Sequence, residues 1–365
     1  MKKTKLTLLC SPKQWKTIPT KDLINDGYPV YGANGVIGYY DEYNHSTDTI
    51  IIGCRGSCGN VNIARGKSYI NGNAMCLDEL SSEVDLQYLY YFLQNYDFRS
   101  VISGTTIPQV TKQGLEKIDV LVLPMVQQKQ IVRKLQLLDS VIEDRRTELG
   151  YFDTLIKSRF IEMFGDPITN EKNWSMYPLE SVCKTIVDCP HSTPNYIAED
   201  TGYMCIRTSI VKKNRILWDE IEYISHEEYI QRIQRKRPEK GDVVYTREGA
   251  ILGIAAMIDR DCNVALGQRS MLLSPNTDKC LPQFLSVAMN FESFLKKALG
   301  GVSGSASPHI NVGDIKTFTI ILPPIELQKQ FTAFIEQIDK SKFEIQQSLE
   351  KLEILKKSLM QQYFG

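Results

Sequence analysis

The chain contains one long stretch twice, first as VQQKQIVRKLQLLDSVIEDRRTELGYFDTLIKSRFIEMFG (residues 126–165) and again as ELQKQFTAFIEQIDKSKFEIQQSLEKLEILKKSLMQQYFG (residues 326–365). The two copies align without a gap at a constant offset of 200 residues. Gln128, Asp139 and the pair Phe164-Gly165 all recur at that offset. Two unrelated amphipathic helices would have no reason to keep a fixed offset, so the pattern favours an internal duplication.

Each copy is predicted to form one long helix. Both lack internal proline, and Gly150 is the only internal glycine. The apolar residues step alternately by four and three positions over about five heptads, which is typical of a coiled-coil seam. We expect the two helices to pack antiparallel along this seam. Its residues are Ile131, Leu135, Leu138, Ile142, Leu149, Phe152, Ile156 and Met163 in the first copy, and Phe331, Ile335, Ile338, Ile345, Leu349, Leu352, Leu359 and Tyr363 in the second.

The composition indicates a globular protein with more than one domain. A chain of 365 residues is too long for one ordinary core. Hydrophobic residues make up 42% and charged residues 24%, as in soluble globular proteins. The 43 basic and 43 acidic side chains cancel, which argues against a protein that coats nucleic acid unaided. Local basic faces remain compatible with this balance, as does a complex whose partners supply phosphate contacts.

The sequence gives no positive signal for a membrane, an export signal or a metal site. It has no 18-residue apolar run, and its basic start lacks the apolar core of a signal peptide, so we expect a cytoplasmic protein. Nine cysteines without a framework spacing indicate reduced thiols. The four histidines are scattered at His45, His191, His226 and His309. We therefore expect small buried thiols and no metal ligands, even for the Cys54 and Cys58 pair.

A globular segment precedes each helix, and the two segments are weakly similar. A Trp-x3-Pro motif at 15–19 recurs at 174–178, and residues 71–77 correspond to 266–272. Glycine-rich and β-branched runs in both predict short strands and tight turns. Each segment closes with a polar loop, a strand and a proline that starts the helix. The predicted organisation is α+β, with globular segments 1–123 and 166–322 and helical segments 124–165 and 323–365.

The search for catalytic motifs is negative. The sequence has no GxGxxG after a strand, no GxxxxGK[ST] and no GxSxG elbow. The glycine-rich run at 53–59 is better read as a tight strand connection that lets the backbone approach a ligand. The run at 188–194 carries an Asp and a His without a nucleophile, so its alternatives are a structural turn and a loop that contacts a ligand.

Polar and basic side chains on the predicted loops remain as candidates for DNA contact. Arginine can read guanine with a bidentate fork, and glutamine or asparagine can read adenine. The alternative for each is an ordinary solvated side chain, including the basic cluster at 232–240. The candidates are Asn34, Arg55, Ser57, Lys67, Thr105, Thr106, Gln109 and Lys112 in the first segment, and His191, Ser192, Thr193, Arg207, Arg247, Gln268, Arg269, Ser305 and His309 in the second.

Taken together, these motifs resemble one known family. The doubled unit has a Trp-x3-Pro entry, a Pro-x3-Gln helix start and a Lys-Ser…Phe-Gly end. Asp-x-Pro-His-Ser-Thr-Pro at 188–194 and Tyr-Gly-Ala-Asn-Gly-x-Ile-Gly at 31–38 are also similar to its motifs. The sequence resembles the specificity subunit of type I restriction-modification systems over nearly its whole length.

This resemblance implies two target-recognition domains held apart by two antiparallel helices in a pseudo-twofold arrangement. Such a subunit reads a bipartite, asymmetric DNA site, with half-site centres about one helical turn, roughly 34 Å, apart. It recruits two methyltransferase subunits and optionally two restriction subunits. It has no catalytic residues, and S-adenosylmethionine, ATP and Mg are expected on the partners. We expect amides beside the helix seam to dock those partners, namely Gln128, Gln130, Gln328 and Gln330.

Three alternatives stay open at this stage. The first is a specificity subunit of a methyltransferase-only or fused restriction system. The second is a self-contained DNA-modifying enzyme, against which the missing catalytic and cofactor motifs argue. The third is a coiled-coil scaffold that binds only proteins.

Overall fold

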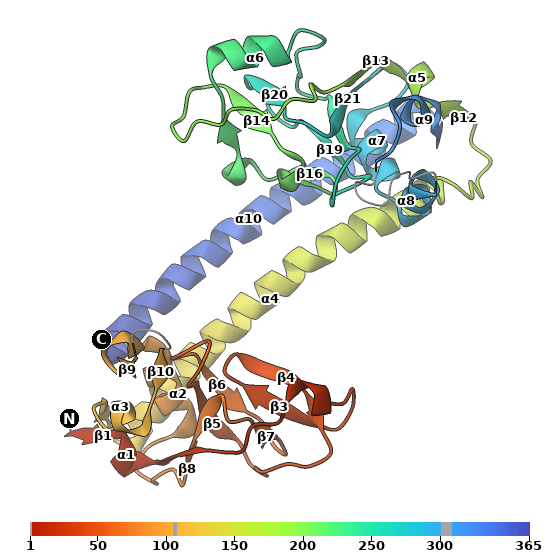
Figure 1. The fold of residues 1–365 in the computed structure, drawn as a ribbon. Helices are drawn as coiled ribbons and strands as arrows, with labels where there is room; N and C mark the ends of the chain where they lie inside the picture. The colour runs from red at the N-terminus through yellow and green to blue at the C-terminus, as the bar shows by residue number, and fades with distance from the viewer. Residues whose placement is uncertain (1, 105–107, 301–308) are drawn as a thin grey trace. The chain divides into compact units, whose positions relative to one another are not determined.

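Two long helices and two β-rich halves make up the computed structural model, which describes residues 2–104, 108–300 and 309–365 (Figure 1). Helix α4 spans Met125–Phe164 and helix α10 spans Ile325–Phe364, each with 40 residues. The chain divides into two compact units, residues 1–147 with 346–365 and residues 148–345. Both helices therefore contribute to both units. This architecture confirms the predicted α+β class, with two β-rich halves joined by long helices.

The seam residues pack the two helices against each other within each unit. In the first unit Ile131 and Leu135 are buried, and Lys356 Nζ lies 2.5 Å from Asp139 Oδ1. In the second unit Ile156 and Ile338 are buried. There Lys342 Nζ lies 2.7 Å from Asp153 Oδ1. Since residue numbers rise along α4 as they fall along α10, the helices run antiparallel, as the sequence predicts.

The first half is built on a four-stranded antiparallel sheet with the order β2-β8-β5-β6. Its strands are β2 (Ser11–Gln14), β8 (Ala74–Asp78), β5 (Thr49–Gly53) and β6 (Val61–Ala64). Helix α2 (Leu86–Asn95), the start of α4 and the end of α10 join the core on one face. A smaller sheet, β4-β3-β7, consists of β3 (Tyr28–Gly32), β4 (Gly35–Tyr40) and β7 (Tyr69–Ile70).

The second half repeats this plan. Its sheet has the order β13-β21-β18-β19, with β13 (Cys183–Asp188), β21 (Ser270–Pro275), β18 (Val243–Thr246) and β19 (Ala255–Met257). Helix α7 (Pro282–Met289) takes the place of α2. A three-stranded sheet consists of β17 (Glu222–Tyr223), β14 (Met204–Ile206) and β20 (Val264–Leu266). The main core of the second half contains aromatic rings from α4, α7 and α10, among them Phe160, Phe284 and Phe331.

Short elements complete both halves. The first half adds β1 (Lys2–Lys5), α1 (Leu6–Leu9), η1 (Thr20–Asp22), η2 (Phe98–Ser100), β9 (Ile102–Ser103), β10 (Gln109–Val110), α3 (Lys112–Leu115) and β11 (Asp119–Val122). The second adds β12 (Met176–Pro178), α5 (Leu179–Val182), η3 (Thr208–Ile210), β15 (Val211–Lys212), β16 (Arg215–Ile216), η4 (Trp218–Glu220), α6 (His226–Arg232), α8 (Glu292–Leu299), α9 (Val312–Thr317) and β22 (Thr319–Ile321). None of the described helices is long and apolar enough to span a membrane.

The strand ladders fix which residues of the two halves are equivalent. Gly53 pairs with Ala74 as Thr246 pairs with Ser270, and the side chains of Ile52 and Tyr245 both enter the larger core. Residues 72–73 are therefore equivalent to 268–269. The correspondence expected from the sequence, 71–77 with 266–272, is wrong by one residue, because matching the two glycines misplaces the register of the following strands.

Candidate nucleic-acid interface

In the second half, three strand ends bring most of the candidate residues together. Asp188 ends β13, Thr246 ends β18 and Ser270 begins β21, all at the same end of one sheet. This end of the sheet, with the loops beyond it, is called the sheet edge below. The loops beyond these ends carry His191, Ser192, Thr193, Gln268 and Arg269. His309 joins the same edge through a β-bridge with Glu248. The Thr193 hydroxyl lies 3.4 Å from Gln268 Oε1, which links two of these loops directly.

The buried Arg247 side chain links the segments that meet at this edge. Its side chain is only 6% exposed, and its Nε and one terminal nitrogen donate to the two Asp188 carboxylate oxygens at 2.8 and 3.2 Å. The other terminal nitrogen lies 2.8 Å from Glu248 Oε1. These contacts tie Arg247 to the protein, which supports a role in positioning the loop that follows Asp188. That Arg247 also contacts DNA stays a prediction.

Part of the basic cluster at 232–240 holds the same loop. The Arg232 side chain is 2% exposed, pairs with Glu228 at 2.7 Å and donates to the Ser192 carbonyl oxygen at 2.9 Å. Arg235 donates to the Asp188 carbonyl oxygen at 3.1 Å. The loop carrying His191 is consequently preorganised by two arginines behind it. The His191 ring itself is 63% exposed, with Nε2 3.0 Å from Asp188 Oδ2.

Arg269 is the most available cation at this edge. It is exposed and has a backbone φ of 71°, a conformation that an arginine adopts only at a cost of about 1 kcal/mol or more. Its carbonyl oxygen accepts the Arg247 N–H at 3.0 Å, which keeps it in this conformation. Its guanidinium crosses Gly249, where an added Cβ would lie 3.5 Å from the side chain. Such strain tends to be retained at functional positions.

Arg207 follows β14 and lies beside Gly267, next to the same edge. Its Nε is 3.0 Å from Glu222 Oε2, and its guanidinium lies 5.5 Å from the centre of the Tyr196 ring. Burial is the main cause that raises the pKa of Tyr196, so this phenol stays neutral. Arg207 is thus partly engaged, unlike Arg269.

The equivalent edge of the first half carries Arg55. Arg55 follows Gly53 at the end of β5, is exposed, and has no side-chain partner among the residues that the structure describes. A Cβ on Gly53 would lie 2.2 Å from the Ser57 carbonyl oxygen and 2.7 Å from that of Ala33, so only glycine permits this close turn. Ser57 and Ala33 of the β3–β4 turn therefore lie directly beside Gly53, two residues before Arg55.

Asn34 and Gln109 complete this edge. The Asn60 amide donates to Asn34 Oδ1 at 2.6 Å. Gln109 precedes Val110, whose N–H donates to the Cys54 carbonyl oxygen at 3.1 Å, as the Ile310 N–H donates to that of Arg247 in the second half. Lys112 follows on the first turn of α3 and is exposed. Burial raises the pKa of the Cys54 thiol to about 12, so this cysteine acts as an apolar core residue.

Four candidates lie elsewhere or cannot be placed. Lys67 follows β6 beyond Ala64, which pairs with Thr49 at the opposite end of the sheet, so the grouping of Lys67 with Arg55 is wrong. Its ammonium instead lies 5.1 Å from the centre of the Tyr43 ring. Thr105, Thr106 and Ser305 lie outside the described residues.

Two features of this interface were not anticipated. Asn73 is exposed at the position equivalent to Arg269 and becomes a candidate only once the ladder register is known. A groove of about 800 Å³ also lies in the first unit, between the sheet edge and the two long helices. Its polar lining consists of the amides Asn34, Asn60, Asn62, Gln94 and Asn95, the cations Arg146, Lys356 and Lys357, and the carboxylates Asp139, Glu143 and Glu353. Lys356 pairs with Asp139 and Arg146 with Glu353.

Gln128 and Gln328 are not docking residues, which corrects that prediction. Both are fully buried. Gln128 accepts the Asp85 N–H at 2.8 Å and donates to the carbonyl oxygens of Glu83 and Leu123 at 2.8 and 2.7 Å. Gln328 makes the equivalent three bonds, which leaves neither amide free for a partner. Gln130 and Gln330 are exposed.

The helices also expose large apolar side chains away from the seam. The exposed fraction is 68% for Leu137, 67% for Tyr151, 59% for Phe343 and 69% for Ile354. Exposed apolar residues on a helix are frequent where another protein packs. The seam pattern did not single them out because they fall outside its period.

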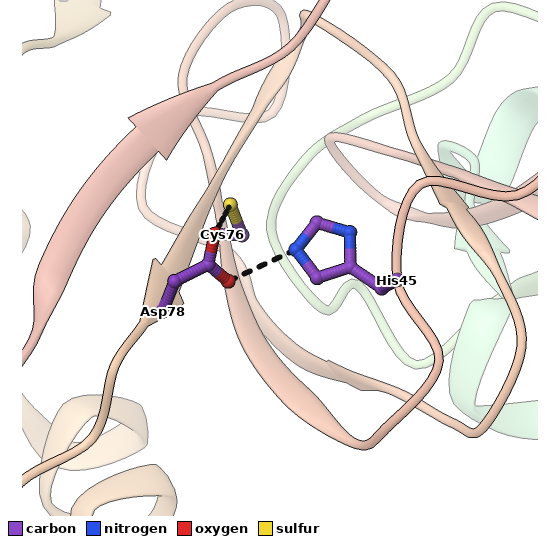
Figure 2. A group of neighbouring side chains, drawn as sticks. All are labelled: His45, Cys76 and Asp78. Carbon is purple, nitrogen blue, oxygen red and sulfur yellow. Dashed lines mark hydrogen bonds and ion pairs between the residues drawn. The ribbon is translucent and has the colours of Figure 1, made fainter.

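One cluster could hold a metal ion. His45 Nε2 lies 2.9 Å from Asp78 Oδ1, and Cys76 Sγ lies 3.2 Å from Asp78 Oδ2 (Figure 2). The three potential ligand atoms lie within 4.8 Å of one another. The sequence predicts small buried thiols and no metal ligands, and its scattered histidines gave no sign of this grouping. His45 is 31 residues from Cys76, and folding alone brings them together.

Comparisons with known proteins agree with this architecture. The family model for the type I restriction modification DNA specificity domain matches residues 1–149 and 171–356. The type I restriction enzyme MjaVIII specificity subunit of Methanocaldococcus jannaschii is 23% identical over 310 residues, which cover 80% of this chain and 73% of that protein.

Two solved structures share the fold. The type I restriction-modification S subunit from M. genitalium has a TM-score of 0.61 at 15% identity, covering 100% of this chain and 96% of that one. A chain from a structure on assembly and conformational transition of the type I R-M system has a TM-score of 0.60 at 16% identity, covering 100% and 97%. The two matched segments, one in each half, together cover most of the chain. The chain therefore belongs to the type I restriction-modification DNA specificity family and is the DNA specificity subunit, a non-catalytic component, of such a system.

Proposed function

We propose that each half of the chain reads one half of a bipartite DNA site, through the loops at the equivalent sheet edges. The observation that carries this proposal is the repetition of the edge itself. Both halves present side chains beyond the same three strand ends, yet the side chains differ: Arg55, Gln109 and Asn73 in the first, Glu248, His309 and Arg269 in the second. Equivalent backbone positions that carry different side chains suit the recognition of two different half-sites.

In the second half, Arg269 and Gln268 are the proposed base readers. They sit on adjacent positions of one turn, so an arginine fork and an amide can address neighbouring bases. Each bidentate pair contributes about 1–3 kcal/mol of discrimination against the wrong base. His191 and Thr193 flank them on a loop that Arg232 keeps in place. A preorganised loop loses little conformational entropy on binding.

In the first half, Arg55 and Gln109 are the proposed base readers, supported by Asn34 and Asn73. Arg55 is exposed and follows the tight turn at Gly53, which packs against Ala33 of the β3–β4 turn. The amide-lined groove in the same unit continues from Asn34 to Lys356 and Lys357 of α10. Its amides and Lys357 suit contact with the sugar-phosphate backbone, which positions the duplex without reading sequence, whereas Lys356 pairs with Asp139.

We also propose that the chain recruits two modification subunits, and restriction subunits where the system has them. The exposed apolar residues of α4 and α10, together with Gln130 and Gln330, are the proposed docking positions. Leu155 and Leu355 support a repeated docking mode, because they occupy equivalent positions of the duplicated helices and are 46% and 48% exposed. S-adenosylmethionine, ATP and Mg would then bind the partners.

The test is methylation by the reconstituted complex. The chain is expressed alone, with its modification subunits, and as the Arg269→Met and Arg55→Met variants with those subunits. Methylated positions are then mapped on a random DNA library. We expect no methylation by the chain alone and one bipartite motif from the complex. Each variant should relax one position, in opposite halves of the motif. Methylation by the isolated chain, or loss of rate in both variants without any change of motif, would contradict the proposal.

A further inference from the structure

His45, Cys76 and Asp78 meet at one end of the β2-β8-β5-β6 sheet (Figure 2). Cys76 and Asp78 are two residues apart in β8, so their side chains lie on the same face of the strand. His45 comes from the connection between β4 and β5, where its backbone forms a bridge with Ser68. The Cys76 residue is fully buried, and the His45 side chain is 9% exposed. A sulfur, a nitrogen and a carboxylate thus meet in a nearly closed site.

The hydrogen bonds around His45 fix the orientation of its ring and the role of Nδ1. The Asn44 amide donates to the Ile70 carbonyl oxygen at 3.1 Å, and Asn44 Oδ1 accepts the Ile70 N–H at 2.8 Å. This pair of bonds fixes Oδ1 as the atom that faces His45 Nδ1, at 2.7 Å. Because an amide oxygen can only accept, Nδ1 must carry hydrogen. Nε2 is the ring nitrogen that faces Asp78. A metal-binding histidine usually donates its other ring N–H to an oxygen, as Nδ1 does here.

The surroundings of Cys76 also favour a cation. Its Sγ lies 3.1 Å from the Lys13 carbonyl oxygen and 3.2 Å from Asp78 Oδ2. Both are acceptors, whereas a thiol has one hydrogen to donate. The Trp15 indole N–H is buried and has no partner among the described residues. A metal-bound thiolate would remove the S–H and accept the indole N–H.

We propose that His45 Nε2, Cys76 Sγ and the Asp78 carboxylate bind a zinc-like divalent cation. Sulfur, nitrogen and oxygen donors together suit Zn²⁺, whose bonds to them are about 2.3, 2.0 and 2.0–2.2 Å long. A tetrahedral site with these bonds separates its ligand atoms by about 3.3–3.6 Å. The two contacts to Asp78, at 2.9 and 3.2 Å, are close to these separations. The three ligand atoms lie within 4.8 Å of one another, so the side chains would move closer together around the ion. The Lys13 carbonyl oxygen or a water molecule takes the fourth position.

The site has a structural role. Asp78 pairs with Ser11, and Thr49 with Ala64, at the sheet end opposite Gly53. The cation therefore joins the connection that carries His45 to the main sheet, away from the side chains proposed to read DNA. Metal removal should lower the stability of the first half without rewriting a methylated motif.

The experiment uses the full chain and Co²⁺ as the probe. One equivalent of Co²⁺ should give tetrahedral visible absorption and a near-ultraviolet thiolate band. Zn²⁺ should displace it, and protons should be released on binding. Cys76→Ser should abolish the thiolate band, and His45→Gln should weaken Co²⁺ binding by at least about 100-fold. Cys10→Ser is the matched control, because Cys10 is also buried in this half but bonds only to the Leu6 carbonyl oxygen.

The wild-type spectrum decides the proposal even if the variants fail to fold. Absence of the thiolate band at one equivalent of Co²⁺ would overturn it. An equal band in folded Cys76→Ser would do the same. In the first case the His45–Asp78 contact would be a structural pair without a metal ion, and Zn²⁺ would leave the melting temperature unchanged.

Discussion

Gln128→Leu should destabilise the first half strongly, although it changes only one side chain near the start of α4. The substitution keeps side-chain size but leaves the Asp85 N–H and the carbonyl oxygens of Glu83 and Leu123 without their partner. Each unsatisfied buried group costs about 1–3 kcal/mol, and the added apolar burial offsets part of that sum. We expect a loss of about 3 kcal/mol. For a unit of this size, that lowers the melting temperature by about 6–12 °C.

The assay is thermal melting, combined with hydrogen exchange at the Asp85 amide. Gln130→Leu is the control, because Gln130 is two residues away and exposed, so its change should stay within about 0.5 kcal/mol. Gln328→Leu should repeat the effect in the second half, where Leu281 N–H loses its acceptor. Equal melting temperatures for Gln128→Leu and Gln130→Leu, with unchanged exchange at Asp85, would refute the anchoring role.

The other predictions separate structure from recognition. Arg247→Met should cost about 3 kcal/mol, because it removes the two-bond partner of the largely buried Asp188 carboxylate and leaves it only His191. Arg269→Met should leave melting unchanged and relax one base in the second half-site. Equal melting temperatures and equal motifs for the two variants would count against both roles. Arg55→Ala should change preference only in the first half-site, and Lys67→Ala should leave the motif intact; a motif altered by Lys67→Ala would return that lysine to the interface. Leu149→Asp should place an unpaired charge in the helix seam and lower the melting temperature by several degrees; an unchanged melt would argue against the seam.

The sequence anticipated the features that depend on periodicity. The helix seam followed from a 3.5-residue repeat, because burial in a coiled coil tracks position in the repeat. The two β-rich halves followed from the duplication, since equivalent sequence patterns build equivalent sheets. Both predictions depend on many residues at once, so no single unexpected contact could overturn them.

Individual site residues depended on contacts that no local pattern reports. Arg247 and Arg269 both flank a glycine turn, yet Asp188, far away in sequence, draws only Arg247 inside. Gln128 reads as polar helix surface, and its identical copy at Gln328 was the one signal of a shared buried role. Neither could be assigned without the strand register and the burial of each side chain.

The most direct test of the account exchanges one half's recognition segment. Residues 166–318 are replaced by the equivalent segment of a relative that reads a different site, and the methylated motif is mapped in cells that carry the matching modification subunits. If each half reads its own half-site, the exchange should rewrite one half-site and leave the other half-site and the gap unchanged. A motif in which both half-sites change together would contradict the account.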